Sequence, residues 1–446
     1  MGAFNRGYAQ SLHGFPLQAA ITLCSAWAFT LFGYDQGVLG GLIALPSFLK
    51  ANHISANDAD LQGTIVAIYD IGCLTGCIIA GFVGQKLGRR IYIALGGVFL
   101  VVGAGLQAGA RGSSYLIAGR VIGGIGMESP RYLYACGAVE DADNIMARIY
   151  SVRVDSAEVA KHRADVFAAL EMEKEYKFSF KNLFYDTSPV NTTWRLWLGV
   201  LCQLLQQMDG NNIVSYVGLP LSVLPDIPTA SPYATYLFIH SLGMSQNQAA
   251  ITSGGVTLLF LGGTATTIWT VEHLGRRTVM LYGAVFCSTF MILFTIGLGV
   301  NTDTSLKLSV ASIFLFELSF GASWCGLPWI YVPEIAPLHV RHVGTSMGVF
   351  TQWFITFIVV KFGPMGIQDI GYKFYILFCV FNVLAIPFVY FCVKETKGLS
   401  LEEIDILFAR PEYKHVLQAR LRGDHEASDK GNVRQSEVVL DTMEAK

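Results

Sequence analysis

Six side chains within otherwise apolar stretches of this chain could bind a ligand by hydrogen bonds and ring stacking. A polar group in an apolar span is unfavourable unless it is paired or faces a cavity. Amides both donate and accept hydrogen bonds, and an aromatic ring can stack on an apolar C–H surface. The set could therefore bind a small polar ligand, although any one member could instead make an interhelical hydrogen bond or a simple packing contact. It consists of Gln206, Gln207, Asn212, Tyr216, Trp329 and Gln352.

Four of these side chains lie close together in one apolar stretch. On an ideal helix at about 100° per residue, Gln206 and Tyr216 point about 80° apart, and Gln207 and Tyr216 about 180° apart. They cannot all face one cavity from a continuous helix. We therefore expect the helix to break at Gly210, because discontinuous helices are common at transporter binding sites. The sequence indicates no role for the neighbouring Asp209.

Asp35 and Arg120 could form a titrating pair. A carboxylate inside an apolar span is either neutralised by a proton or paired with a cation, and Arg120 is the only cation in the apolar stretch from Tyr115 to Met127. Protonation of Asp35 would release Arg120 and so bias an equilibrium between two conformations. The alternative is a static ion pair that holds two helices together.

The composition identifies the kind of protein that must position these groups. Hydrophobic residues make up 52% of the chain and charged residues only 14%, with a mean hydropathy of +0.46. An ordinary soluble domain carries about 25% charged residues. The chain contains no basic tract suited to nucleic acid, no nucleotide-binding loop and no cysteine or histidine pattern typical of a metal site. We therefore expect an all-α polytopic membrane protein that is embedded in the lipid bilayer, with no enzyme activity, no cofactor and no nucleic-acid partner.

Nine segments are long and apolar enough to cross a bilayer, which takes about 20 residues. A tenth segment, Tyr115–Met127, is too short and carries Arg120. The nine predicted spans are 17–42, 62–84, 91–109, 194–217, 247–271, 278–300, 307–331, 344–363 and 372–393.

One basic motif occurs twice in short loops between spans. Gly88-Arg89-Arg90 and Gly275-Arg276-Arg277 are 187 residues apart, which is the difference between their first residue numbers. Positive charge near span ends stays on the cytoplasmic side of a membrane. The repeat therefore predicts two halves with the same orientation, which is the layout of a transporter whose site lies between them.

The boundaries of these spans divide the chain into four parts. Residues 1–127 form an N-terminal bundle with spans 1–3 and part of span 4, and residues 128–193 form a charged, helical cytoplasmic linker. Residues 194–398 form a six-helix C-terminal bundle. Residues 399–446 form a polar cytoplasmic tail that begins with an amphipathic stretch, 401–408.

Several strings in the chain occur in order at the spacing of one known family. They include Phe32-Gly33-Tyr34-Asp35, both Gly-Arg-Arg loops, Glu128-Ser129-Pro130-Arg131, Gln206-Gln207, Pro328-Trp329 and Glu395-Thr396-Lys397-Gly398. Through them the chain resembles the sugar porter family of the major facilitator superfamily, most closely its fungal members. The resemblance implies a fold of two helical bundles and a small-molecule sugar or polyol as substrate.

The resemblance also implies roles for individual residues. It implies proton coupling by Asp35 with Arg120. It also implies substrate contacts from the six side chains above except Tyr216, namely Gln206, Gln207, Asn212, Trp329 and Gln352. It further implies a cytoplasmic gate in which Arg276 and Arg277 meet Glu334, and Arg341 meets Glu272. The gate set is Arg89, Arg90, Glu272, Arg276, Arg277, Glu334 and Arg341.

The chain departs from the family pattern in two places. Met127 is followed directly by Glu128, whereas the family has the end of span 4 and spans 5–6 between them, roughly 85 residues of a twelve-span fold. The N-terminal bundle is therefore expected to be incomplete. Residues 217–232 are an additional segment between Tyr216 and Tyr233. A faulty gene model explains both departures, and a real isoform or a decayed gene is the alternative.

The function favoured by these features is proton symport of a sugar or polyol by alternating access. The alternatives are a passive sugar facilitator, a transporter-like sugar sensor and a nonfunctional truncated transporter. We expect a multi-pass protein of the plasma membrane with both termini in the cytoplasm.

Overall fold

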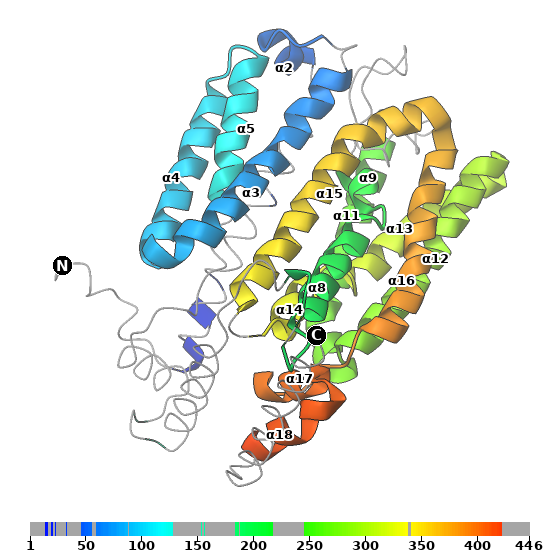
Figure 1. Cartoon of the computed structure of the whole chain (residues 1–446). Helices are drawn as coiled ribbons and strands as arrows, with labels where there is room; N and C mark the ends of the chain where they lie inside the picture. Colours follow the sequence, from blue (N-terminus) through cyan, green and yellow to red (C-terminus); the bar gives the residue numbers. More distant parts are fainter. Residues whose placement is uncertain are drawn as a thin grey trace. The chain divides into compact units, whose positions relative to one another are not determined.

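The structure is a computed structural model. It describes residues 46–55, 59–87, 89–127, 183–186, 188–216, 245–337 and 340–421, together with residues 14–16, 19–20, 23, 33, 153 and 156. Within these ranges every secondary structure element is a helix (Figure 1). The helices are α2 Pro46–Ala51, α3 Ala59–Leu87, α4 Arg89–Ala108, α5 Ser113–Met127, α8 Thr192–Gln207, α9 Asn211–Tyr216, α11 Gln246–Leu274, α12 Arg276–Val300, α13 Asp303–Gly321, α14 Leu327–Ile335, α15 Arg341–Ile370, the 3-10 helix η6 Gly371–Lys373, α16 Phe374–Cys392, α17 Leu401–Phe408 and α18 Pro411–Leu421.

Most predicted spans coincide with single helices. In the part of the chain that the structure describes, five segments are long and apolar enough to cross a membrane: Gly254–Leu274, Arg276–Val300, Asp303–Gly321, Val343–Gly363 and Gly371–Cys392. Shorter apolar stretches occupy Gly63–Ile79 and Leu95–Ala108. The defective candidate is the 15-residue α5. Most of the predicted first span, 17–42, and most of the predicted linker, 128–193, lie outside the described residues.

The predicted break in the span 194–217 is confirmed. Helix α8 ends at Gln207 and α9 begins at Asn211. Gly210 adopts φ of 102°, a conformation that side chains with a Cβ rarely reach. A Cβ at Gly210 would also lie 2.7 Å from Cε of Met291 and 3.1 Å from Cγ of Phe378. Backbone conformation and close packing both require glycine here.

The predicted span 307–331 is divided between two helices. Helix α13 ends at Gly321 and α14 begins at Leu327, with Pro328 in its first turn. Proline fits the first turn of a helix, whereas in a helix interior it removes a backbone hydrogen bond. The connection is held in place by Trp324, whose indole Nε1 donates to the carbonyl of Met280 at 3.1 Å.

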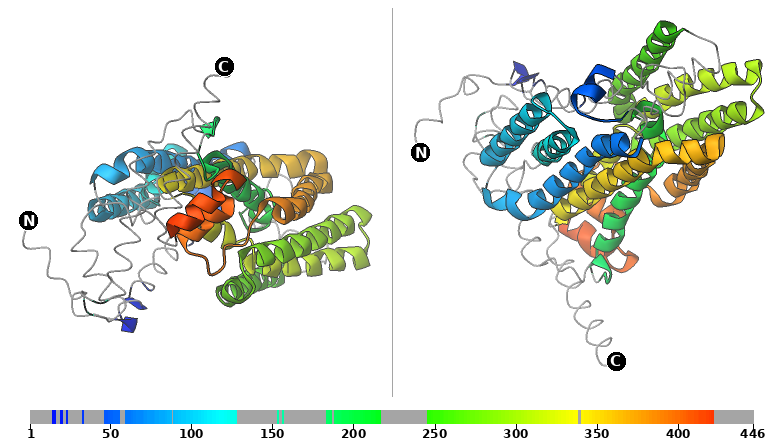
Figure 2. Two further views of the ribbon diagram at one scale, coloured as in Figure 1. Left: turned by 60° about the horizontal axis from the view of Figure 1, so that its bottom comes forward. Right: turned by 90° about the horizontal axis from the view of Figure 1, so that it is seen from above.

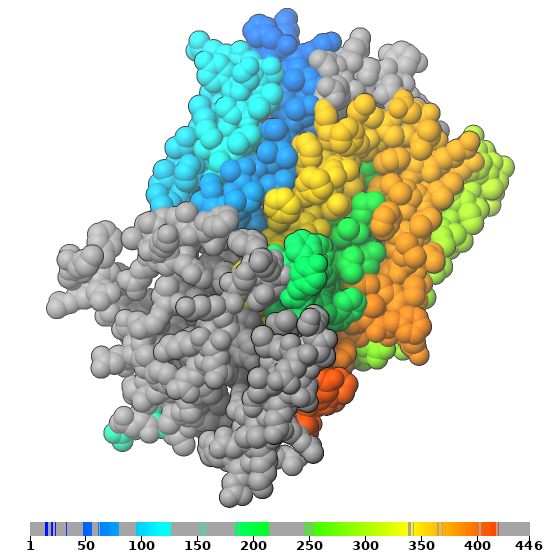
Figure 3. Space-filling view, viewed as in Figure 1, coloured from blue at the N-terminus to red at the C-terminus, as the bar shows by residue number. Residues whose placement is uncertain are grey.

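The described chain forms two compact units. The first contains α2 to α5, residues 212–216 of α9 and residues 356–368 of α15. Helices α3 and α5 approach closely, because a Cβ at Gly72 would lie 2.4 Å from the carbonyl oxygen of Val121, and one at Gly124 would lie 2.4 Å from that of Tyr69. Small residues allow such backbone contact between membrane helices. The side chains of α3 to α5 form one continuous block (Figure 3).

The second unit contains α8, Asn211, α11 to α14, residues 341–355 and 369–370 of α15, η6, and α16 to α18. Helices α12 and α13 lie side by side (Figures 1 and 2). Ser309 on α13 donates to the carbonyl of Phe294 on α12 at 3.0 Å, and Thr267 on α11 donates to the carbonyl of Gly321 at 2.8 Å. Serine and threonine thus satisfy hydrogen bonds between helices of this unit, as is typical of membrane bundles.

The amphipathic stretch predicted at the start of the tail forms α17. Ser400 is its N-cap: its hydroxyl accepts a hydrogen bond from the backbone N–H of Glu403, and the Glu403 carboxylate accepts one from the backbone N–H of Ser400. This reciprocal arrangement satisfies two backbone donors at the start of the helix. A further helix, α18, follows it and was not expected from the sequence.

Candidate functional site

The three amides of the broken helix lie on either side of the break along the chain. Gln206 and Gln207 end α8, and Asn212 is the second residue of α9. All three are buried. Their burial in apolar surroundings means that their hydrogen-bonding groups need partners inside the protein or from a ligand.

Gln206 is held by the protein itself. Its Nε2 donates to the carbonyls of Trp324 and Cys325, both at 2.8 Å, and its Oε1 lies 3.5 Å from Nε2 of Gln207. Both N–H groups of the amide therefore bind the connection that leads into α14. In this conformation the amide nitrogen of Gln206 is bound by the protein, and the predicted contact of Gln206 with substrate stays a prediction.

Glycines bring α8 against α14 and α15. A Cβ at Gly199 on α8 would lie 3.1 Å from Cγ1 of Val332 on α14, and a Cβ at Gly348 on α15 would lie 3.4 Å from Cγ of Gln203. Residues four apart share a helix face, so Gln352 lies one turn beyond Gly348 on the face that packs against α8. The structure thus gathers Gln207 and Gln352 on adjoining helices of one unit.

Gln203 is a buried amide that sequence reasoning missed. It is 1% exposed, and its Oε1 accepts no hydrogen bond in the structure. Gln203 and Gln207 are four residues apart, which places them on the same face of α8. That spacing was the available signal for including Gln203 among the candidates.

Trp329 is half-buried near the start of α14, two residues after the helix begins. Its position follows from the Pro328 helix start, which comes directly after the connection that Gln206 holds. For Tyr216, the structure describes only the backbone, at the end of α9. Its side chain lies outside the described part.

Arg120 lies inside the first unit and is 1% exposed. Its guanidinium stacks on the ring of Tyr69, with Cζ 4.4 Å from the ring centroid, and its Nη2 donates to the carbonyl of Val66 at 3.0 Å. Both partners are on α3. Asp35, the predicted partner of Arg120, lies outside the described residues, so their pairing stays a prediction.

One ion pair expected at the second Gly-Arg-Arg loop is present. Nη2 of Arg276 lies 2.8 Å from Oε1 of Glu334, and Nε lies 3.3 Å from Oε2. Two parallel contacts make this a bidentate pair, the stronger arrangement of arginine with carboxylate. Thr396 also donates its hydroxyl to Oε2 of Glu334 at 2.7 Å. The pair joins the start of α12 to the end of α14.

Glu395 caps α12, a role that the sequence did not reveal. Its carboxylate accepts hydrogen bonds from the backbone N–H groups of Arg276 at 2.8 Å and Arg277 at 3.0 Å. A negative charge at a helix N-terminus satisfies free N–H groups and the helix dipole. Gly275 has φ of 89°, and a Cβ there would lie 2.5 Å from Oε2 of Glu395. The glycine of the motif therefore makes room for the capping carboxylate.

The other predicted gate residues have different surroundings. Nη2 of Arg277 donates to the carbonyl of Tyr390 at 2.7 Å, and Nε of Arg341 lies 3.4 Å from the carbonyl of Ala336. Glu272 is exposed near the end of α11. Arg89 and Arg90 begin α4, but their side chains lie outside the described part.

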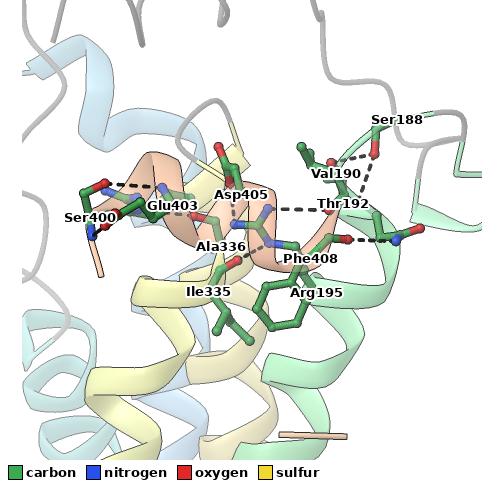
Figure 4. A network of polar contacts seen from close by, with 12 residues as sticks. Ser188, Val190, Thr192, Arg195, Ile335, Ala336, Ser400, Glu403, Asp405 and Phe408 are labelled. Carbon is green, nitrogen blue, oxygen red and sulfur yellow. Dashed lines mark hydrogen bonds and ion pairs between the residues drawn. The ribbon is translucent and has the colours of Figure 1, made fainter. Parts of the chain in front are cut away.

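A second ion pair, in which only the arginine is buried, joins α17 to the start of α8 (Figure 4). Nη2 of Arg195 lies 2.6 Å from Oδ1 of Asp405, and the Arg195 side chain is 1% exposed. Nε of Arg195 also donates to the carbonyl of Ile335 at the end of α14. The ring of Phe408 lies 5.2 Å from Cζ of Arg195. One arginine therefore connects α8, α14 and α17.

Further contacts hold α17 in place. Asn191 donates to the carbonyl of Phe408 at 2.9 Å, and Nε of Arg410 lies 3.2 Å from Oδ1 of Asn191. Lys394 donates its Nζ to the carbonyl of Leu407 at 2.9 Å. Partial burial, with Lys414 and Arg195 nearby, lowers the pKa of Lys394. We call this group of residues, with Arg195 and Asp405, the tail clamp.

Comparison with known protein families finds one family whose sequence profile matches most of the chain. The profile described as "Sugar (and other) transporter" matches residues 21–127 and 128–408. The match is thus in two segments that meet between Met127 and Glu128.

Curated relatives are transporters. The chain is 27% identical over 469 residues to the MFS-type transporter oryC of Aspergillus oryzae, covering 86% of this chain and 84% of that protein. It is 27% identical over 487 residues to the Sugar transporter STL1 of Saccharomyces cerevisiae, covering 90% and 82%. In the first alignment, 86% of 446 residues is about 384, so about 85 of the 469 aligned positions have no residue from this chain.

Solved structures share the fold. The MFS proton:xylose symporter XylE bound to 6-bromo-6-deoxy-D-glucose superposes with a TM-score of 0.70 at 21% identity, covering 87% of this chain and 98% of that chain. The inward open conformation of XylE from E. coli gives a TM-score of 0.56. The described helices therefore have the major facilitator fold, and the protein is a multi-pass membrane protein.

Proposed function

Because the chain belongs to the sugar transporter family of the major facilitator superfamily, we propose that its fold serves the transport of a sugar or polyol by proton symport. Transport proceeds by alternating access, in which two conformations expose one central site to opposite sides of the membrane. Substrate and proton are the two ligands, and neither requires a cofactor.

The observation that carries this proposal is the broken helix. The break at Gly210 leaves Gln207 at the end of one helix and Asn212 at the start of the next. Trp329 on α14 and Gln352 on α15 belong to the helices that pack around α8. We assign Gln207, Asn212, Tyr216, Trp329 and Gln352 to the sugar site. Gln206 supports it through the carbonyls of Trp324 and Cys325.

Proton coupling is assigned to Asp35 and Arg120. Arg120 is buried and anchored on α3 by the Tyr69 ring and the carbonyl of Val66. A fixed cation of this kind stabilises an ionised carboxylate beside it, and protonation of the acid abolishes the attraction. The proton-bound and proton-free states of Asp35 then favour different conformations.

The network around the second Gly-Arg-Arg loop is assigned to gating. The Arg276–Glu334 pair and the Glu395 cap connect α11–α12 to α14 and to the segment after α16. By the positive-inside rule this end of the bundle faces the cytoplasm, with both termini on the same side. We place the protein in the plasma membrane. We also propose that the chain is divided after residues 127, 193 and 398 into an N-terminal bundle, a linker, a C-terminal bundle and a tail.

A second candidate function, a nonfunctional truncated transporter, is favoured by the junction at Met127. Helix α5 has 15 residues and ends there, whereas a span needs about 20. The profile match also divides at this position. We propose that the chain as written inserts in the membrane but does not transport, since the missing helix pair would cover polar surface of the N-terminal bundle.

The experiment compares two proteins in liposomes. One is the 446-residue chain, and the other carries the missing helix pair restored after Met127. Labelled glucose, lactose and glycerol uptake is measured with and without an inward proton gradient. We expect gradient-driven, saturable uptake by the restored protein only. Uptake that ignores the gradient indicates a passive facilitator, and robust uptake by the unrestored chain contradicts the truncation proposal.

A further inference from the structure

Asp209 is a buried acid in the break of the substrate helix that the proposed mechanism does not use. It is 5% exposed. Its Oδ1 accepts a hydrogen bond from the backbone N–H of Asn211 at 2.8 Å, and Asn382 on α16 donates to its main-chain carbonyl at 2.7 Å. Its Oδ2 is buried and has no hydrogen-bond partner in the structure. The side chain is thus fixed in place with one oxygen unsatisfied.

A second buried acid is linked to Asp209 through Asn211. Glu317 on α13 is 1% exposed. With its amide oriented so that the nitrogen faces Glu317, Asn211 places this nitrogen 3.1 Å from each carboxyl oxygen of Glu317. The backbone N–H of Asn211 meanwhile binds Asp209. One residue at the start of α9 therefore contacts both acids.

The described groups around this pair include no cation paired with Asp209. Two thiols interact electrostatically with both carboxyl groups, Cys287 on α12 and Cys325 before α14. Among the described residues Asp209 makes no ion pair, and Gly210 beside it packs on Met291 and Phe378. An ionised carboxylate in such surroundings would be strongly unfavourable, since buried charges need a partner or a bound ion.

We propose that Asp209 and Glu317, linked by Asn211, form a proton-binding site in the C-terminal bundle, with the proton held on the Asp209 carboxyl group. A proton on Oδ2 removes the charge while Oδ1 continues to accept from Asn211. This site does not include Asp35, and its existence does not depend on the proposed sugar symport.

Because the site lies in the helix break, binding or loss of the proton changes the charge within the break. Gln207 precedes Asp209 by two residues and Asn212 follows it by three. Loss of the proton puts a negative charge between them, beside Asn211 and close to Glu317. The site therefore couples proton occupancy to the geometry of the break, and this use in transport rests on the proposed function.

The test uses infrared spectroscopy on the full 446-residue protein in lipid nanodiscs. A neutral carboxyl group gives a C=O stretching band that an ionised carboxylate lacks. The spectrum of wild type minus Asp209→Asn at neutral pH is expected to contain this band. Asn preserves the Oδ1 acceptor, and Asp303→Asn at the exposed start of α13 is the matched control, expected to leave the band unchanged.

The outcomes distinguish the proposal from its alternatives. No band in the wild-type difference spectrum, or a band lost only in Glu317→Gln, overturns the assignment to Asp209. If the band appears only when choline replaces sodium, the carboxylate binds a sodium ion when sodium is present. That result also overturns the proposed proton site. If Asp209→Asn does not fold, wild type grown on carboxyl-¹³C aspartate must show a shift of the band, and an unshifted band contradicts the proposal. None of these results depends on transport, so they remain separate from the uptake experiment.

Discussion

The buried Arg195 at the start of α8 and the partly exposed Asp405 in α17 form an ion pair with 2.6 Å between Nη2 and Oδ1. The two residues are 210 positions apart in the sequence, the difference between residue numbers 405 and 195. Arg195 also binds the carbonyl of Ile335, so the same guanidinium links the tail to α14. The tail helix is thereby part of the bundle that carries Gln207 and Trp329.

The first prediction concerns this pair. Asp405→Asn should lower the free energy of unfolding by about 1.5–3 kcal/mol, because a buried arginine loses a charged hydrogen-bond acceptor. Thermal unfolding in detergent measures the loss. The double variant Arg195→Met/Asp405→Leu should recover part of it, since an apolar pair leaves no buried charge. Equal stability of Asp405→Asn and wild type would show that the tail clamp contributes nothing.

The second prediction concerns Gly275. Gly275→Ala should destabilise the protein more than Gly371→Ala does, by at least about 1 kcal/mol. Both glycines have positive φ, 89° and 60°, but only at Gly275 would a Cβ meet the Glu395 carboxylate, whereas Gly371 has open space. Thermal unfolding of the two variants makes the comparison. Identical losses would mean that the capping carboxylate moves away at no cost.

The third prediction separates two neighbouring amides. Gln206→Ala should reduce stability by about 1–3 kcal/mol, because the carbonyls of Trp324 and Cys325 lose their donor. Gln207→Ala should reduce stability less. Chemical or thermal unfolding of both variants in the same detergent tests this difference. A larger loss in Gln207→Ala would reverse the roles that we assign.

The fourth prediction concerns substrate affinity in the restored protein. Gln207→Ala and Trp329→Ala should each raise the apparent Km for sugar by about tenfold or more, since losing an amide or a stacking partner costs about 1–3 kcal/mol. Trp269→Ala is the control, because Trp269 is 62% exposed on α11. Unchanged affinity in both site variants would place the pocket elsewhere.

The fifth prediction concerns Asp35 in the same restored protein. Asp35→Asn should abolish accumulation of sugar against its gradient and the pH dependence of uptake, because the amide mimics the protonated acid permanently. Exchange of labelled for unlabelled sugar should survive. The control is Asp303→Asn at the exposed start of α13. Continued uphill uptake by Asp35→Asn would exclude this residue as the coupling site.

The sequence by itself determined the positions of most helices, because long apolar runs must be helical in a membrane. It also determined the break at Gly210, since the angles between Gln206, Gln207 and Tyr216 on one helix are fixed by helix geometry. The family and the position of the junction at Met127 likewise followed from local strings of residues.

The tertiary structure decided which partner each polar group has. Gln206 and Gln207 are adjacent and identical in type, yet only packing against the Trp324–Cys325 connection makes Gln206 a structural support. Glu395 belongs to a family motif, but its role as the cap of α12 is seen only in the folded structure. Nothing in the sequence predicts that Arg195 and Asp405 form an ion pair. Hydrogen bonds and ion pairs act over about 3 Å, so their partners are known only when distant segments are brought together.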